Sequence, residues 1–166
     1  MKIYLAGKIP KGDHERKNFV DWRERYRKAM QKFFDAEFID PLARNLDETD
    51  PMAVVGKDCR DIKESDFIVV CAEGEMSVGG AQEMVIAKYL KKPVVTVLPK
   101  DTTHRRSNIT FSGKFVSDWI HPFIFAFSDF IIEDIGEIEK IKDKILTSKI
   151  KDISVINEAI RHVGQK

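Results

Sequence analysis

The sequence predicts a single α/β domain with a flavodoxin- or Rossmann-like, doubly wound, mainly parallel sheet of five strands. Continuous apolar runs at residues 66–72 and 91–99 are typical of parallel strands that are covered on both faces. These runs alternate with stretches whose apolar residues recur at helical spacing. The 166 residues, 43% of them hydrophobic, are enough to build one domain around a proper core.

In the first half of the chain, strand-like and helical patterns alternate twice. Residues 2–9 are a buried first strand, and Asp13 is expected to cap a helix over residues 15–34. A second strand at residues 36–41 ends at Pro41. Pro51 then opens a helix that runs to Glu64 and leads into the third strand.

In the second half the same alternation continues and then weakens. The expected elements are a loop at 73–80, a helix at 81–90, a strand at 91–99, an irregular, mobile connection at 100–113, a short helix at 114–119, the last strand within 122–134, and helices at 135–146 and 152–163. We expect residues 1–134 to form the α/β domain. Residues 135–166 are expected to pack on that domain, or, for the final helix, on a partner subunit.

Composition excludes several classes of function. The formal net charge of +1 argues neither for nor against a nucleic-acid partner. Long basic runs are absent, the densest basic cluster being the short run at 104–106, and we expect no nucleic-acid polymer as a partner. Cys59, Cys71 and the four histidines lack the spacing of metal ligands, so we expect no metal and no cofactor. No apolar stretch approaches the ~20 residues that span a membrane, and the chain opens on a strand-like segment. We therefore expect a cytoplasmic protein without a signal peptide or a membrane partner.

The predicted fold also locates a binding site, because open parallel sheets bind ligands beyond the carboxyl ends of their strands. Residues 7–12, 40–45 and 73–83 should meet there. Gly79 and Gly80 in "SVGGAQE" allow close approach of the backbone to a ligand, and the helix start behind them favours an anion. The segment matches neither the Walker loop nor the dinucleotide fingerprint.

Two acidic residues near this edge are candidates for chemistry. Glu83 follows the glycines, where it either complements the helix dipole or acts as a reactive carboxylate. Asp58 lies about two turns before the end of the helix that precedes the third strand. Two carboxylates in one cleft are what glycosidic bond cleavage requires, one attacking the anomeric carbon and one protonating the leaving group.

Four segments resemble the nucleoside 2-deoxyribosyltransferase family, and within it the 2'-deoxynucleoside 5'-phosphate N-hydrolases most closely. They are "IYLAGKI" (3–9), "KDCRDIKESDFIVV" (57–70), "SVGGAQEMVIAKYLKKPVV" (77–95) and, more weakly, "KFVSDWI" (114–120). They span most of the first 120 residues in the family's order. The third is the most specific, with its glycine-rich turn, glutamate, small-residue helix and Lys-Pro before a strand.

The resemblance implies a role for each matching residue. Glu83 matches the nucleophile that attacks C1' and forms a glycosyl ester, Tyr4 the tyrosine that positions it, and Asp58 the aspartate that helps to protonate the departing base. Ser77 matches a serine that contacts the 5'-phosphate. Ser117 matches a phosphate-directed serine from a neighbouring subunit, with Trp119 near the base or sugar across that interface. The family therefore implies a homodimer or higher homo-oligomer with a shared site.

Around the expected phosphate the sequence departs from the family pattern. The hydrolases carry a serine and two arginines where this chain has Lys8, Pro10 and Asp13. We expect Gly7, Lys8 and Ile9 to line the site, and Lys8 with Lys11 either supplies positive charge or lies solvated at the surface. Ser77 favours a phosphate, since an aspartate there would repel it, although a small polar residue also suits a loop. Asp40 either touches the base or sugar or forms a turn with Pro41.

These observations support three hypotheses of function. The first is an N-glycosidase that cleaves the base from nucleoside or deoxynucleoside 5'-monophosphates. The second is a transferase that exchanges bases between deoxynucleosides. The third belongs to another class, a nucleotide-binding or sensing domain without turnover.

Overall fold

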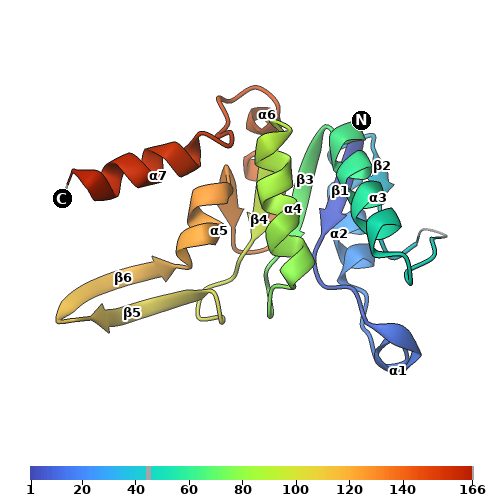
Figure 1. Cartoon of the computed structure of the whole chain (residues 1–166), viewed down its shortest axis with the longest axis horizontal. Helices are drawn as coiled ribbons and strands as arrows, with labels where there is room; N and C mark the ends of the chain where they lie inside the picture. Colours follow the sequence, from blue (N-terminus) through green and yellow to red (C-terminus); the bar gives the residue numbers. More distant parts are fainter. Residues whose placement is uncertain (44–45, 166) are drawn as a thin grey trace.

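A computed structural model describes residues 1–43 and 46–165, and Figure 1 shows how their elements are arranged. Among these residues, five parallel strands form one sheet in the order β2-β1-β3-β4-β7. The strands are β1 (Lys2–Ala6), β2 (Glu37–Ile39), β3 (Phe67–Cys71), β4 (Val94–Val97) and β7 (Phe130–Ile132). The predicted α/β fold with a five-stranded parallel sheet is confirmed. Strand order reverses between β1 and β3, which is where such sheets form a crevice at their carboxyl edge.

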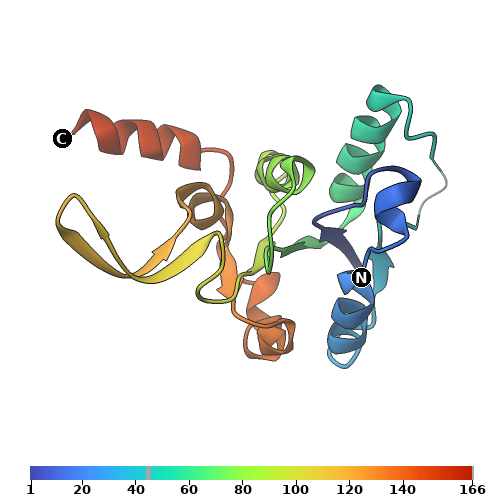
Figure 2. The same ribbon diagram turned by 90° about the horizontal axis from the view of Figure 1, so that it is seen from below.

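Side chains of β1 alternate between the two faces of the sheet, and both faces are buried. Ile3 and Leu5 join one apolar cluster, whereas Tyr4 and Ala6 join the other. Figure 2 shows helices on both sides of the sheet. The face of Tyr4 is covered by α3 (Pro51–Glu64), α4 (Val78–Tyr89) and α5 (Pro122–Phe127). The opposite face is covered by α2 (Trp22–Met30), the 3₁₀ helix η1 (Ile135–Lys140) and α6 (Lys142–Ile145).

The prediction of one long helix at residues 15–34 is wrong. The chain forms a short α1 (Gly12–Arg16) and a separate α2. Asp21 causes the division, because its carboxylate accepts a hydrogen bond from the backbone N–H of Arg23 at 3.1 Å and caps a new helix. In contrast, the helix predicted from Pro51 to Glu64 is confirmed, with Asp50 as its N-cap.

Two further predictions are also wrong, namely an irregular connection at 100–113 and a short helix at 114–119. These residues form an antiparallel hairpin of β5 (Arg105–Phe111) and β6 (Lys114–Ile120). Ser112 and Gly113 make a two-residue turn with φ values of 48° and 80°. Positive φ at both central positions is the geometry that joins two twisted antiparallel strands, so this turn specifies a hairpin.

Helix α4 begins three residues earlier than predicted. The expected loop at 73–80 ends at Ser77, whose hydroxyl oxygen accepts from the N–H of Gly80 at 3.1 Å. Gly79 and Gly80 therefore lie inside the helix, and Glu83 occupies its second turn.

The C-terminal residues divide into two parts. Ile135, Ile138 and Ile145 of η1 and α6 are buried in the core of the sheet. By contrast, α7 (Val155–Gly164) contains no buried residue, and it extends from the body at the same end as the β5–β6 hairpin (Figures 1 and 2). Its packing partner, and the predicted boundary at residue 134, stay predictions.

Candidate active site

Tyr4, Asp58 and Glu83 meet between the sheet and the helices α3 and α4. The Tyr4 hydroxyl lies 2.7 Å from Oε1 of Glu83 and 3.3 Å from Oδ1 of Asp58. A phenol has one proton to donate, and the shorter distance assigns it to Glu83. The two distances place the carboxyl oxygens of Glu83 and Asp58 no more than about 6 Å apart. Three elements that are distant in sequence thus bring two carboxylates to one hydroxyl.

Local sequence explains how each of the three side chains is aimed. The alternation of β1 turns Tyr4 toward α3 and α4, where it is fully buried. Helices α3 and α4 lie side by side on that face (Figure 1), and α3 presents Asp58 from its middle. Glu83 is only 6% exposed, on the side of α4 that faces the tyrosine. The reading of Glu83 as a simple complement to the helix dipole loses its basis, because the dipole acts mainly in the first turn.

The three glycines that were predicted to line the site differ in how closely other atoms surround them. Gly7 has a φ of +154°, and a Cβ there would lie 2.7 Å from the indole of Trp22. A Cβ on Gly80 would lie 3.6 Å from the Cα of Gly7, so this pair lets α4 pack directly on the end of β1. A Cβ on Gly79 would meet no atom within 4 Å. Gly79 is therefore the glycine whose backbone faces open space at the start of α4.

Ser77 caps α4 and lies beside that open space. Its hydroxyl accepts from Gly80, yet a hydroxyl that accepts one hydrogen bond can still donate its own proton to a ligand. The predicted phosphate contact of Ser77 is compatible with this geometry, and it stays a prediction.

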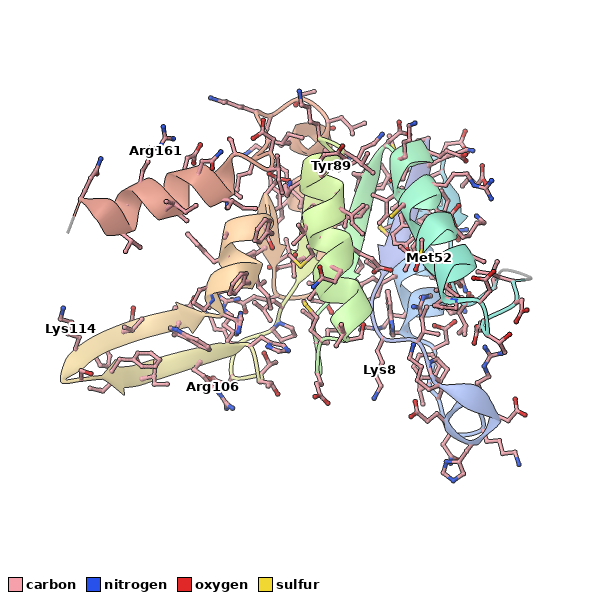
Figure 3. All side chains as sticks on the ribbon, in the orientation of Figure 1. Lys8, Met52, Tyr89, Arg106, Lys114 and Arg161 are labelled. Atoms are coloured by element: carbon pink, nitrogen blue, oxygen red, sulfur yellow. The ribbon has the colours of Figure 1, made fainter. Side chains whose placement is uncertain are left out.

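The loop after β1 is held from below by a residue that the sequence reasoning missed. The guanidinium of Arg23 is fully buried and donates to the carbonyl oxygens of Gly7 and Lys8 at 3.3–3.5 Å. Figure 3 shows Lys8 itself extending away from the body, and Ile9 is half-buried. An arginine between Trp22 and Tyr26, on a predicted apolar helix face, was the available signal. The assignment of one long helix obscured it.

The carboxylate of Asp40 is bound by other residues of the same chain. It pairs with Arg23 at 3.1 Å and Arg27 at 2.7 Å, and accepts from the N–H of Leu42 at 2.8 Å. This arrangement matches the turn role that the sequence left open. Arg44 and Asn45, at the end of the same predicted site segment, lie outside the described residues.

Ser117 and Trp119 are not brought to Glu83 within one chain. Both lie on β6, and the hairpin extends from the sheet edge away from α3 and α4 (Figure 1). Ser117 is exposed, and the ring of Trp119 lies near Phe111 and His121. Their contribution to a neighbouring subunit's site stays a prediction.

Across residues 1–43 and 46–165, no cluster of three histidine, cysteine or acidic side chains is placed to hold a metal ion. Within the same part of the chain, no helix combines the length and apolar character needed to cross a bilayer.

The fold matches solved structures of 2-deoxyribosyltransferases. The enzyme from Bacillus psychrosaccharolyticus aligns with a TM-score of 0.56 at 18% identity, over 84% of this chain and 90% of that one. The enzyme from Leishmania mexicana gives 0.56 at 15% identity, over 90% and 99%. A CMP N-glycosidase from Clostridium botulinum gives 0.48 at 15% identity, over 86% and 99%. No protein-family model and no curated protein matches the chain.

The two structures with TM-scores of 0.56 show the fold of the chain. The chain has the α/β fold of the 2-deoxyribosyltransferases, with a tyrosine-bridged carboxylate pair between its sheet and the helices α3 and α4.

Proposed function

We propose that this protein is a retaining N-glycosidase that releases the base from nucleoside 5'-monophosphates. The observation that carries the proposal is the bridge from Tyr4 to both Glu83 and Asp58. Retaining glycosidases hold two carboxyl groups ~5–5.5 Å apart, whereas inverting ones need ~6.5–9.5 Å to admit a water. The limit of about 6 Å between the carboxyl oxygens favours the retaining geometry.

In this mechanism Glu83 attacks C1' of the sugar as the bond to the base breaks. Asp58 protonates the departing base, so that the base leaves as a neutral molecule. Water then attacks C1' and breaks the ester bond to Glu83, while Asp58 accepts the proton of the water, so that both side chains return to their starting states. Tyr4 holds Glu83 in the orientation for attack, and a hydrogen bond from a phenol to a carboxylate strengthens when both are shielded from water.

The phosphate is assigned to the start of α4. Ser77 and the open backbone at Gly79 lie there, where helix N–H groups and the dipole favour an anion. Ser117 of a second subunit and Lys8 add donors to the same group, so the active unit of this proposal is a homo-oligomer.

A panel of nucleosides and 5'-monophosphates, with products separated by chromatography, tests the proposal. We expect free base and sugar phosphate from at least one monophosphate. Glu83→Gln should lower the rate by on the order of 10³-fold or more, because the nucleophile is lost while side-chain shape is kept. Glu64→Gln, an exposed glutamate on α3, is the matched control and should match the wild type. Base release by Glu83→Gln at the wild-type rate would refute the mechanism.

Base exchange between deoxynucleosides is the second candidate. The observation that favours it is the likeness to two 2-deoxyribosyltransferase structures with TM-scores of 0.56. Adding a second base to the assay separates the two, since a transferase yields a new nucleoside and a hydrolase yields free sugar. Tight nucleotide binding with neither product would instead support a binding or sensing domain.

A further inference from the structure

The segment between β3 and α4 is held in place by side chains from other parts of the chain. Arg25 of α2 forms an ion pair with Glu73 at its beginning. At its end, the backbone N–H of Met76 donates to Nε2 of His104 at 3.0 Å. Ser77 follows Met76 and caps α4, the helix that carries Glu83. The hydrogen bond from Met76 to His104 therefore helps to fix the position at which α4 begins.

His104 is itself held in place by the hairpin. Its carbonyl oxygen accepts from the backbone N–H of His121 at 2.8 Å, which extends the β5–β6 pairing by one step. The two imidazole rings lie edge to face with centroids 5.8 Å apart. Both histidines line a cavity of about 430 Å³ between α4 and α5, which Ser77 also borders.

The bond to Met76 dictates the protonation state of the imidazole. A backbone N–H can only donate, so Nε2 must carry a lone pair and the ring proton must be on Nδ1. A second proton on the ring would set one N–H against another and remove the acceptor. The His104–Met76 bond therefore exists only while the imidazole is neutral.

The surroundings of His104 favour that neutral form. Burial is the main cause that lowers the pKa of His104, and the nearby His121 lowers it further, whereas Glu75 acts in the opposite direction. The neighbouring Arg105 directs its guanidinium to Asp118 at 2.6–2.8 Å. The sides that α4 and α5 turn to the cavity are neutral or apolar, apart from His121 at the start of α5.

We propose that His104 is a positioning residue, which as a neutral imidazole holds the 73–77 segment and, through Ser77, the start of the helix that carries Glu83. Protonation of His104 releases the segment and lowers activity in mild acid. The link to activity rests on the proposed function, but the link between His104 and Met76 does not.

The first experiment follows the Met76 amide by NMR as the pH falls from about 7.5 to about 5, the range in which histidines titrate. In the wild type, its protection from hydrogen exchange should fall roughly 3- to 10-fold as His104 titrates, the value of one typical hydrogen bond. His104→Gln keeps an acceptor without a titrating group, so protection should persist across the range. His104→Phe should lack the protection throughout. In His121→Gln the protection should still fall with pH, but at a higher pH than in the wild type, because His121 no longer lowers the pKa of His104.

The second experiment compares base release by the same variants. At neutral pH, kcat/KM of His104→Phe should be roughly 3- to 10-fold below that of the wild type, whereas His104→Gln should have the wild-type value. When the pH is lowered, kcat/KM of the wild type should fall in part because His104 is protonated. His104→Gln should lack that part of the fall. A merely structural role would leave the pH profile of His104→Gln the same as that of the wild type. A Met76 amide that keeps its protection in His104→Phe, or after His104 is protonated, would overturn the proposal. Absence of base release by the wild type would refute the proposed function alone, since the NMR result stands by itself.

Discussion

Tyr4 is the residue on which the geometry of the site depends. It is fully buried, it lies on the central part of the sheet, and its hydroxyl contacts both carboxylates. Such a hydrogen bond to a charged group contributes more than one between neutral groups, about 1.5–3 kcal/mol. In the proposed mechanism its role is to select one orientation of Glu83 among the rotamers that a glutamate can adopt.

Replacing Tyr4 with phenylalanine removes that hydroxyl and leaves the ring. We expect kcat for base release to fall by about 10- to 100-fold, because Glu83 loses the donor that orients it. The measurement is steady-state kinetics on the best monophosphate of the panel. Tyr89→Phe, on the exposed face of α4, is the control and should retain full activity. Equal rates for Tyr4→Phe and the wild type would show that the bridge does not matter for turnover.

At the scale of elements, the start of α4 combines packing and access. Gly80 and Gly7 bring the helix onto the end of β1, and Gly79 leaves its backbone open beside Ser77. Gly7 thus stands where a side chain would clash with Trp22, whereas Gly79 faces open space. This difference can be measured.

Alanine substitutions at Gly7 and Gly79 should have opposite effects on stability. Gly7→Ala meets Trp22 at 2.7 Å and carries a φ of +154°, so we expect the free energy of unfolding to fall by about 2 kcal/mol or more. Gly79→Ala lies in a helix with open space, so it should raise the free energy of unfolding by roughly 0.5–1 kcal/mol. Denaturation in urea measures both.

The Gly79→Ala variant also tests how closely the substrate approaches α4. If a phosphate or sugar lies against Gly79, the added methyl group should raise KM of Gly79→Ala although the protein is more stable. A stabilised Gly79→Ala with unchanged KM would place the ligand elsewhere.

At the scale of the whole molecule, the hairpin and α7 both extend from one end of the sheet (Figure 2). The hairpin carries Ser117, which the resemblance assigns to a neighbouring active site, and it exposes Phe115. The proposed mechanism therefore predicts that a second subunit supplies part of the site.

Mixing two inactive variants tests the shared site. In a symmetric dimer of Glu83→Ala and Ser117→Ala chains, one of the two sites regains both wild-type residues, so an equal mixture should recover about a quarter of wild-type activity. Chromatography with light scattering should show an oligomer, and Ser148→Ala, at an exposed position, serves as the control. A monomer, or a mixture that recovers no activity, would contradict the shared site.

How well each part could be predicted depends on the range of the interactions that determine it. The bounds of α3 were predicted correctly because Asp50 and Pro51 mark its start with local backbone chemistry. The hairpin was missed because Ser112 and Gly113 form its turn through positive φ angles. A short polar stretch of sequence does not reveal such angles. The division between α1 and α2 was missed because the apolar spacing continues across the cap at Asp21.

The sequence by itself determined the fold class and the residues worth considering, because apolar periodicity and chain order depend only on neighbours along the chain. The tertiary structure alone decided that Tyr4 contacts Asp58 as well as Glu83, that Asp40 is bound by two arginines, and that His104 reaches the start of α4. These contacts join residues 13 to 79 positions apart, and their distances follow from how strands and helices pack on the sheet.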